Sequence, residues 1–145
     1  MVNERKAKGF DDPVGREATA IDGSRSRYER GRDVLAEISG ISADAPKAGY
    51  AVFAPTIERF LKEHLFADIF ERDLLTYRER ELATVSVLAG VGGVEPMASG
   101  HMAICLHLGI TAEQLSALLN IMETNLGKTY SDPLRGVLNQ LTEKR

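Results

Sequence analysis

The sequence predicts an all-α protein of about six helices. Apolar residues recur at intervals of three and four along most of the chain, as they do on one face of a helix. No segment shows the apolar-polar alternation of a half-buried strand. Two segments, Thr76–Glu79 and Thr111–Gln114, match the capping box that begins a helix. With 145 residues, the chain is long enough for one domain with a buried core.

Composition and charge exclude several classes of partner. A net charge of −3 gives no basic face for nucleic acid or for an anionic membrane. The longest uncharged stretch, Leu82 to Val94, has about thirteen residues, whereas a membrane span needs roughly twenty. The first residues contain no apolar segment of the kind found in a secretory signal. We therefore expect a soluble, cytoplasmic protein.

The cysteine and histidine content predicts neither a metal nor a cofactor. Cys105 is the only cysteine, so one chain has no disulfide, no CxxC redox pair and no cysteine-based zinc site. The spacing of His64, His101 and His107 matches no HExxH-type pattern. The glycine-rich segment GVGG also lacks the pattern of a phosphate-binding loop.

The N-terminal part of the chain divides near Ser24. Residues 1–23 are polar and lack periodicity, which predicts a flexible arm, and residues 24–145 are expected to form the helical domain. The first helix of this domain should end at Gly40, a residue suited to a C-terminal cap. Its apolar face is formed by Tyr28, Val34, Leu35 and Ile38.

Two prolines delimit the next helical segment. Pro46 is placed to open a helix, and Pro55 should end or kink it because proline cannot continue the hydrogen-bond ladder. After Pro55, apolar residues again follow helical spacing, and Phe60 to Phe70 is the most aromatic part of the chain. We interpret this face as core or subunit interface in preference to an aromatic substrate pocket.

The central helix should begin at Thr76 and remain apolar as far as Ala89, which predicts burial on several sides. The following segment, Gly90–Gly93, predicts a turn whose glycines can adopt positive φ. The next helix should start at Glu95-Pro96 and stop at Gly109.

Two further helices are expected at the C-terminal end. One starts at Thr111 and ends at Gly127, with an apolar stripe between them. The other should be capped by Asp132-Pro133. The inward-facing residues of the two helices are expected to be Leu115, Leu118, Leu119, Met122, Leu126, Leu134, Val137, Leu138 and Leu141.

Three side chains on the central helix pair could perform chemistry. His101 is suited to proton transfer near neutral pH, and Glu81 could orient its ring if the two helices run antiparallel. Cys105 follows His101 by one helical turn, so both face the same way. Each has a structural alternative. Glu81 could pair with Arg78 or Arg80 at the surface, His101 could be structural, and Cys105 could be a small core hydrophobe.

The order and spacing of three longer segments resemble a known family. The segments are RYERGRDVLAEISG, FLKEHLFADIFERDLLTYRERELATVSVLAG and HMAICLHLGITAEQLSALL, and they cover roughly residues 26–127. They are similar to the carboxymuconolactone decarboxylase family, which is related to the AhpD-type alkylhydroperoxidases. The resemblance implies an AhpD-like helical bundle that assembles into a ring-like homotrimer or homohexamer, with active sites at or near subunit contacts.

The resemblance also assigns candidate site residues. Glu81 matches the glutamate of the family's RE element, His101 matches the histidine after the central turn, and Arg72 matches the arginine after the aromatic segment. Val94 and Met97 stand where the AhpD branch has its CxxC cysteines, so disulfide cycling of that type is not supported. NLGKTYSDPLR and FADIF also depart from the patterns usual in decarboxylases, which leaves the particular lactone open.

The leading hypothesis is a cofactor-independent decarboxylase of a small carboxylated lactone or a related intermediate of aromatic catabolism. In it, His101 donates a proton or stabilises charge, Glu81 orients His101, and Arg72 or Arg80 binds the substrate carboxylate. The first alternative is a thiol-dependent peroxidase, with peroxiredoxin activity, that uses Cys105 alone. The second is a non-catalytic helical assembly module.

Overall fold

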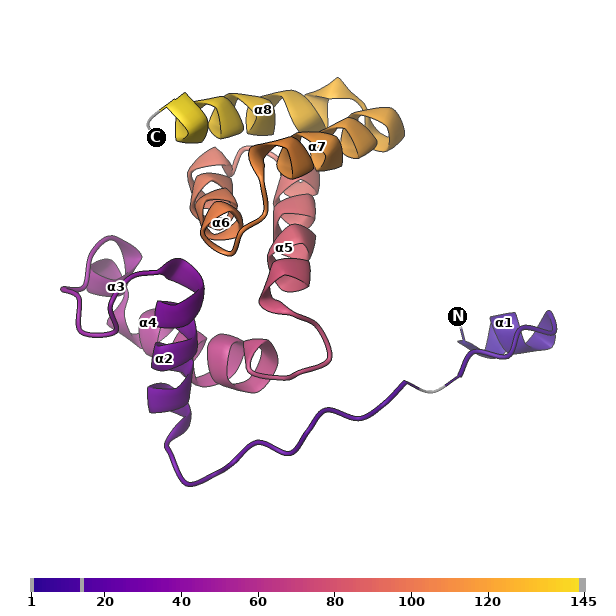
Figure 1. The fold of residues 1–145 in the computed structure, drawn as a ribbon. Helices are drawn as coiled ribbons and strands as arrows, with labels where there is room; N and C mark the ends of the chain where they lie inside the picture. The colour runs from indigo at the N-terminus through magenta and orange to yellow at the C-terminus, as the bar shows by residue number, and fades with distance from the viewer. Residues whose placement is uncertain (1, 14, 144–145) are drawn as a thin grey trace.

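The computed structural model describes residues 2–13 and 15–143, and over these residues it contains helices and no strands (Figure 1). The all-α prediction is confirmed. The described residues form eight α-helices and one π-helical segment, more than the six helices expected. In chain order they are α1 (Val2–Ala7), α2 (Arg27–Ser39), α3 (Tyr50–Phe53), α4 (Pro55–Phe60), η1 (Leu61–Phe70), α5 (Tyr77–Val91), α6 (Glu95–His107), α7 (Ala112–Leu126) and α8 (Lys128–Glu143).

The helices enclose two apolar clusters. In Figure 1, α7 and α8 lie side by side across one end of α5 and α6, while α2 packs near η1 on the other side of α6. The larger cluster contains Val85, Leu88, Ala89, Ala98, Met102, Cys105, Ile110, Leu115, Leu119, Met122, Leu134, Val137 and Leu138. The smaller one contains Val34, Ile38, Phe66 and Phe70. Ile104 of α6 and Leu108, the residue that follows α6, pack against the smaller cluster, so α6 contacts both clusters.

Local capping accounts for the start of three helices and for several helix ends. The capping boxes at Thr76 and Thr111 are both present, with each threonine accepting a hydrogen bond from the backbone three residues later. Gly40 caps α2 at φ 70°, and Gly127 follows α7 at φ 99°, as expected. Ser26 forms a third capping box that the sequence reasoning did not identify, so α2 begins at Arg27.

Two boundaries predicted from prolines are wrong. Pro46 does not open a helix; it lies in the loop before α3, because Gly49 takes φ 55° and ψ −129°, which is incompatible with a helix. Pro133 does not begin the last helix; it lies inside α8, which starts five residues earlier at Lys128. There Ser131 and Leu134 are both buried, so packing of this extra turn offsets the hydrogen bond that proline forfeits. The break expected at Pro55 is confirmed, since α4 begins there.

The aromatic segment forms a π-helix rather than an α-helix. Its i→i+5 pattern continues at the C-terminal end, where the Glu71 amide donates to the Phe66 carbonyl over 3.0 Å. Phe66 and Phe70 are buried against α2, whereas Phe60 is 58% exposed. The core prediction is therefore confirmed for one face of the segment only.

The N-terminal segment extends away from the helices (Figure 1). It is attached through Asp73, whose carboxylate accepts hydrogen bonds from the Thr19 amide at 3.0 Å and the Thr19 hydroxyl at 2.8 Å. Arg16 pairs with the same carboxylate at 3.1 Å. The flexibility of residues 1–23 stays a prediction, and so does the extent of the helical domain, residues 24–145. Both ranges include residues outside the described part of the chain, namely 1, 14 and 144–145. No helix in the described part of the chain is long and apolar enough to cross a membrane.

The contact between α2 and η1 depends on Gly31. A Cβ atom at this position would lie 1.8 Å from the Lys62 carbonyl oxygen, a backbone atom that cannot rotate away. We predict that Gly31→Ala lowers the free energy of unfolding by roughly 1–3 kcal/mol, because the two helices must separate. Urea unfolding would measure this. Gly136→Ala in α8 is the matched control, since its Cβ meets no atom within 4 Å, and it should be neutral or stabilising. Equal stability of the two variants would contradict the prediction.

The attachment at Asp73 should be sensitive to acid. The hydrogen bonds from Thr19, helped by Arg16, lower the pKa of Asp73 from 3.8 to about 2. Since the folded pKa is the lower one, the contact stabilises the attached segment above about pH 4 and is lost as the pH falls toward 2. Carboxyl NMR of Asp73, followed together with the Thr19 amide, should show this transition. A Thr19→Val variant should raise the pKa, and titration of wild-type Asp73 near 3.8 would refute the expectation.

Candidate functional site

The candidate site lies between α5 and α6, which fold back on each other. The two helices are joined by a short turn in which Gly92 and Gly93 have φ values of 70° and 68°. Gly90, expected in the turn, instead belongs to the last turn of α5. Because the connection is so short, early residues of α5 lie beside the middle of α6 (Figure 1).

This arrangement brings Glu81 and His101 together. His101 Nδ1 donates to Glu81 Oε2 over 2.8 Å. The Glu81 side chain is only 1% exposed, and that of His101 is 29% exposed. The alternative in which Glu81 forms a surface ion pair with Arg78 or Arg80 is therefore wrong: the carboxylate is buried and bonds the imidazole.

The hydrogen bond defines which imidazole nitrogen is available for chemistry. A carboxylate accepts hydrogen bonds, so the contact with Glu81 keeps the proton on Nδ1. No described residue forms a hydrogen bond with Nε2, and the ring is partly open to solvent. His101 can therefore accept or donate a proton through Nε2 while Glu81 keeps its ring oriented.

The second oxygen of Glu81 is a buried acceptor that is not used. Glu81 Oε1 has no hydrogen-bond partner among the described residues. A buried acceptor without a partner costs free energy, typically about 1–3 kcal/mol.

Cys105 lies next to this pair but in the interior. Its residue is fully buried and belongs to the larger apolar cluster. Burial, together with the negative charge of Glu81, raises the pKa of the thiol to about 12. The predicted end of α6 is confirmed here, since the Ile110 amide donates to the Cys105 carbonyl over 3.0 Å and Gly109 has φ 81°. This environment is that of a core residue and disfavours thiol chemistry.

The two candidate arginines lie outside the hydrogen-bonded pair. Arg80 Nη2 donates to the Arg72 carbonyl over 3.0 Å, and the Arg80 guanidinium carbon lies 5.8 Å from the centre of the Phe70 ring. Arg80 Nε is buried and has no partner among the described residues, whereas Arg72 is exposed. No hydrogen bond or ion pair joins either arginine to Glu81 or His101.

The other histidines serve elsewhere. His64 Nδ1 lies 3.2 Å from Asp68 Oδ2. The His107 ring packs against Gly40, in the space that a side chain at Gly40 would need. Within the described ranges, no group of three or more His, Cys, Asp or Glu side chains is arranged to hold a metal ion.

Sequence reasoning missed a buried charged cluster on α4 and η1. Glu58 is 3% exposed and pairs with both Lys62 and Lys47. The one available signal was the i,i+4 spacing of Glu58 and Lys62, which is common on solvated helix surfaces and does not predict burial.

The helix pair lies in a part of the chain that matches a known protein family. The sequence model of the carboxymuconolactone decarboxylase family matches residues 55–129, just over half of the chain, from α4 to the start of α8. The chain belongs to the carboxymuconolactone decarboxylase family. The matched region contains Arg72, Arg80, Glu81, His101 and Cys105, and so the helix pair that forms the candidate site. No curated protein matches the chain.

The chemical state of Cys105 gives a direct test of the thiol alternative. With a pKa of about 12, the thiol has roughly a thousandfold less thiolate at neutral pH than an unperturbed cysteine. We predict that native protein reacts with iodoacetamide at least about a thousandfold more slowly than the same protein in guanidinium chloride, as followed by mass spectrometry. Rapid alkylation, or a sulfenic acid formed with peroxide at neutral pH, would instead support the peroxidase alternative.

Proposed function

We propose that this protein is a cofactor-independent carbon-carbon lyase that decarboxylates a small carboxylated lactone or a related intermediate of aromatic catabolism. One observation carries the proposal: His101 and the buried Glu81 are joined by a 2.8 Å hydrogen bond. Membership of the carboxymuconolactone decarboxylase family supports the choice of reaction.

The proposed chemistry needs charge stabilisation and one proton transfer. The bond between the ring carbon and the carboxylate breaks, CO2 leaves, and the electron pair remains as an enolate delocalised onto the lactone carbonyl. The protonated His101 stabilises this negative charge and then gives the Nε2 proton to carbon. The negative charge of Glu81 stabilises the imidazolium in a buried environment, where the interaction is stronger than in water.

The substrate carboxylate needs a cationic partner, and we propose Arg72 or Arg80 for this role. An arginine fork binds a carboxylate through two parallel hydrogen bonds. Arg80 supports this assignment because, among the described residues, its guanidinium makes one hydrogen bond, from Nη2 to the Arg72 carbonyl, and keeps further N–H donors. Cys105 has no role in this mechanism.

We also propose that the protein self-associates as a homotrimer or homohexamer. Five large hydrophobic residues on α3 and α4 are more than half exposed, and burying them would provide a hydrophobic contact. They are Tyr50, Val52, Phe53, Ile57 and Phe60. Subunit contacts near the α5–α6 pair would close the open side of His101 from water.

The proposal predicts that His101→Ala reduces decarboxylation of 4-carboxymuconolactone by roughly a hundredfold to ten-thousandfold, because the proton donor is lost. Substrate loss would be followed by ultraviolet absorbance and CO2 release. The oligomer measured by light scattering should be unchanged. His64→Gln is the matched control, since His64 is a partly exposed histidine outside the pair, and it should retain full turnover.

Two outcomes would count against this assignment. Normal turnover by His101→Ala would remove His101 from the mechanism. A wild-type protein that is folded and oligomeric but converts no carboxylated lactone would favour the non-catalytic assembly module.

A further inference from the structure

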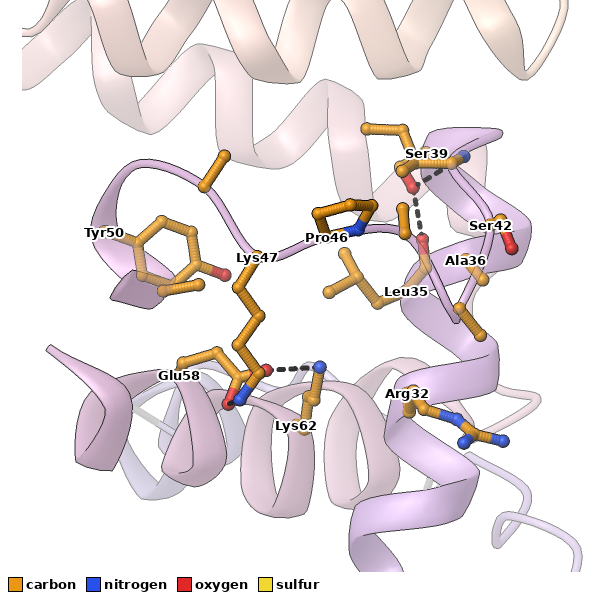
Figure 2. Close-up of a pocket in the computed structure, with 15 residues that line it drawn as sticks. Arg32, Leu35, Ala36, Ser39, Ser42, Pro46, Lys47, Tyr50, Glu58 and Lys62 are labelled. Atoms are coloured by element: carbon orange, nitrogen blue, oxygen red, sulfur yellow. Dashed lines mark hydrogen bonds and ion pairs between the residues drawn. The ribbon is translucent and has the colours of Figure 1, made fainter. Parts of the chain in front are cut away.

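A cavity of about 280 Å³ lies beside α2, apart from the α5–α6 helix pair that holds Glu81 and His101. It is bounded by α2, by the loop that leads to α3, and by the junction of α4 and η1 (Figure 2). No residue of α5 or α6 lines it. Its walls are largely apolar, with Leu35, Ile41, Pro46 and Tyr50 among the lining side chains.

The cavity has a charged floor. Figure 2 shows Lys47 reaching from the loop toward Glu58, with Lys62 beside the same carboxylate. Lys47 Nζ donates to Glu58 Oε2 over 3.1 Å, and Lys62 Nζ donates to Glu58 Oε1. Lys62 also lies 5.1 Å from the centre of the Tyr28 ring.

The three groups are charged and carry a net positive charge. Burial alone would raise the pKa of Glu58, but its hydrogen bonds to Lys62 and Lys47 outweigh burial and lower it. For Lys62, burial alone would lower the pKa, but the hydrogen bond to Glu58, the negative charge of Glu58 and the contact with Tyr28 together outweigh burial and raise it. At neutral pH the floor therefore consists of two ammonium groups and one carboxylate.

Neither lysine is fully used by Glu58. An ammonium group has three N–H donors, and Lys47, whose side chain is 49% exposed, forms one hydrogen bond within the described chain. The remaining donors of Lys47 are available to an anion in the cavity, whereas Lys62, which is 9% exposed, also donates to the Tyr28 hydroxyl over 3.5 Å and keeps one donor. A buried ion pair is also a poor source of stability, because apolar residues of similar volume commonly stabilise a fold as well or better. Lys62 moreover belongs to the π-helix η1, a structure found frequently at functional sites.

From these observations we infer that the cavity is a second binding site, which takes a small organic monocarboxylate with a compact apolar body. The carboxylate would bind Lys47 and Lys62, and the apolar body would lie against Leu35, Ile41 and Pro46. A volume of about 280 Å³ suits a molecule the size of a single ring, since it lies at the lower end of ligand cavities. The site is independent of the proposed decarboxylation.

Benzoate and benzamide are matched probes of this site, because they differ in charge and hardly in shape. Isothermal titration calorimetry with the full chain should show saturable binding of benzoate, with benzamide at least about tenfold weaker. Methyl NMR shifts should locate benzoate at Leu35 and Ile41. Turnover at His101 should be unchanged when the cavity is altered.

Variants test the two halves of the site separately. Ala45→Phe fills the cavity from the loop and should abolish benzoate binding. Lys47→Met leaves Glu58 paired with Lys62 and should weaken benzoate about tenfold. Lys128→Met, at an exposed lysine of α8, is the control and should change nothing.

Any of four results would overturn the inference. Three of them are no saturable binding of benzoate by the wild-type protein, equal affinity for benzamide, and unchanged affinity in a folded Lys47→Met variant. Loss of benzoate binding through His101→Ala alone would place the probe at the other site and would also overturn it. Because calorimetry reports binding and not turnover, failure here is distinguishable from failure of the proposed decarboxylase activity.

Discussion

The hydrogen bond between Glu81 and His101 is the constraint on which the arrangement of the central helices depends. An ionised carboxylate in an apolar interior is costly unless a partner compensates it. Glu81 is fully buried in the α5–α6 interface, and the imidazole of His101 is its one hydrogen-bond partner in the described structure. The two helices must therefore keep one register and one separation, because a shift of one turn would leave the carboxylate without any partner.

Several local features maintain this register. The capping box at Thr76 sets where α5 begins, and Gly92 and Gly93 permit the tight turn that leads into α6. Gly109 and the Ile110 amide terminate α6 beyond Cys105. Burial on several sides then stabilises the pair, with α7 and α8 covering one end (Figure 1). In this arrangement Nδ1 of His101 bonds Glu81, while the imidazole ring is 29% exposed.

The other half of the molecule is organised by a close backbone approach. Gly31 lets α2 contact the carbonyl of Lys62, and this contact places α2 over η1. Beside α2 and η1 lies the cavity that is lined by Glu58 and by its two partners, Lys47 and Lys62. The two halves of the fold thus contain different chemistry, an acid-imidazole pair in one and an ammonium-rich cavity in the other, joined by α6.

The sequence by itself determined the all-α class, the capping boxes at Thr76 and Thr111, and the glycine caps, because these depend on hydrogen bonds within a few neighbouring residues. It also identified Glu81 and His101 as candidates. Only the tertiary structure decided that the two meet, since twenty residues separate them, whereas the alternative partners of Glu81, Arg78 and Arg80, are its neighbours in the sequence. It also decided the π-helix, the interior position of Pro133 and the buried Glu58–Lys62 pair, since each depends on packing against distant helices that local periodicity does not encode.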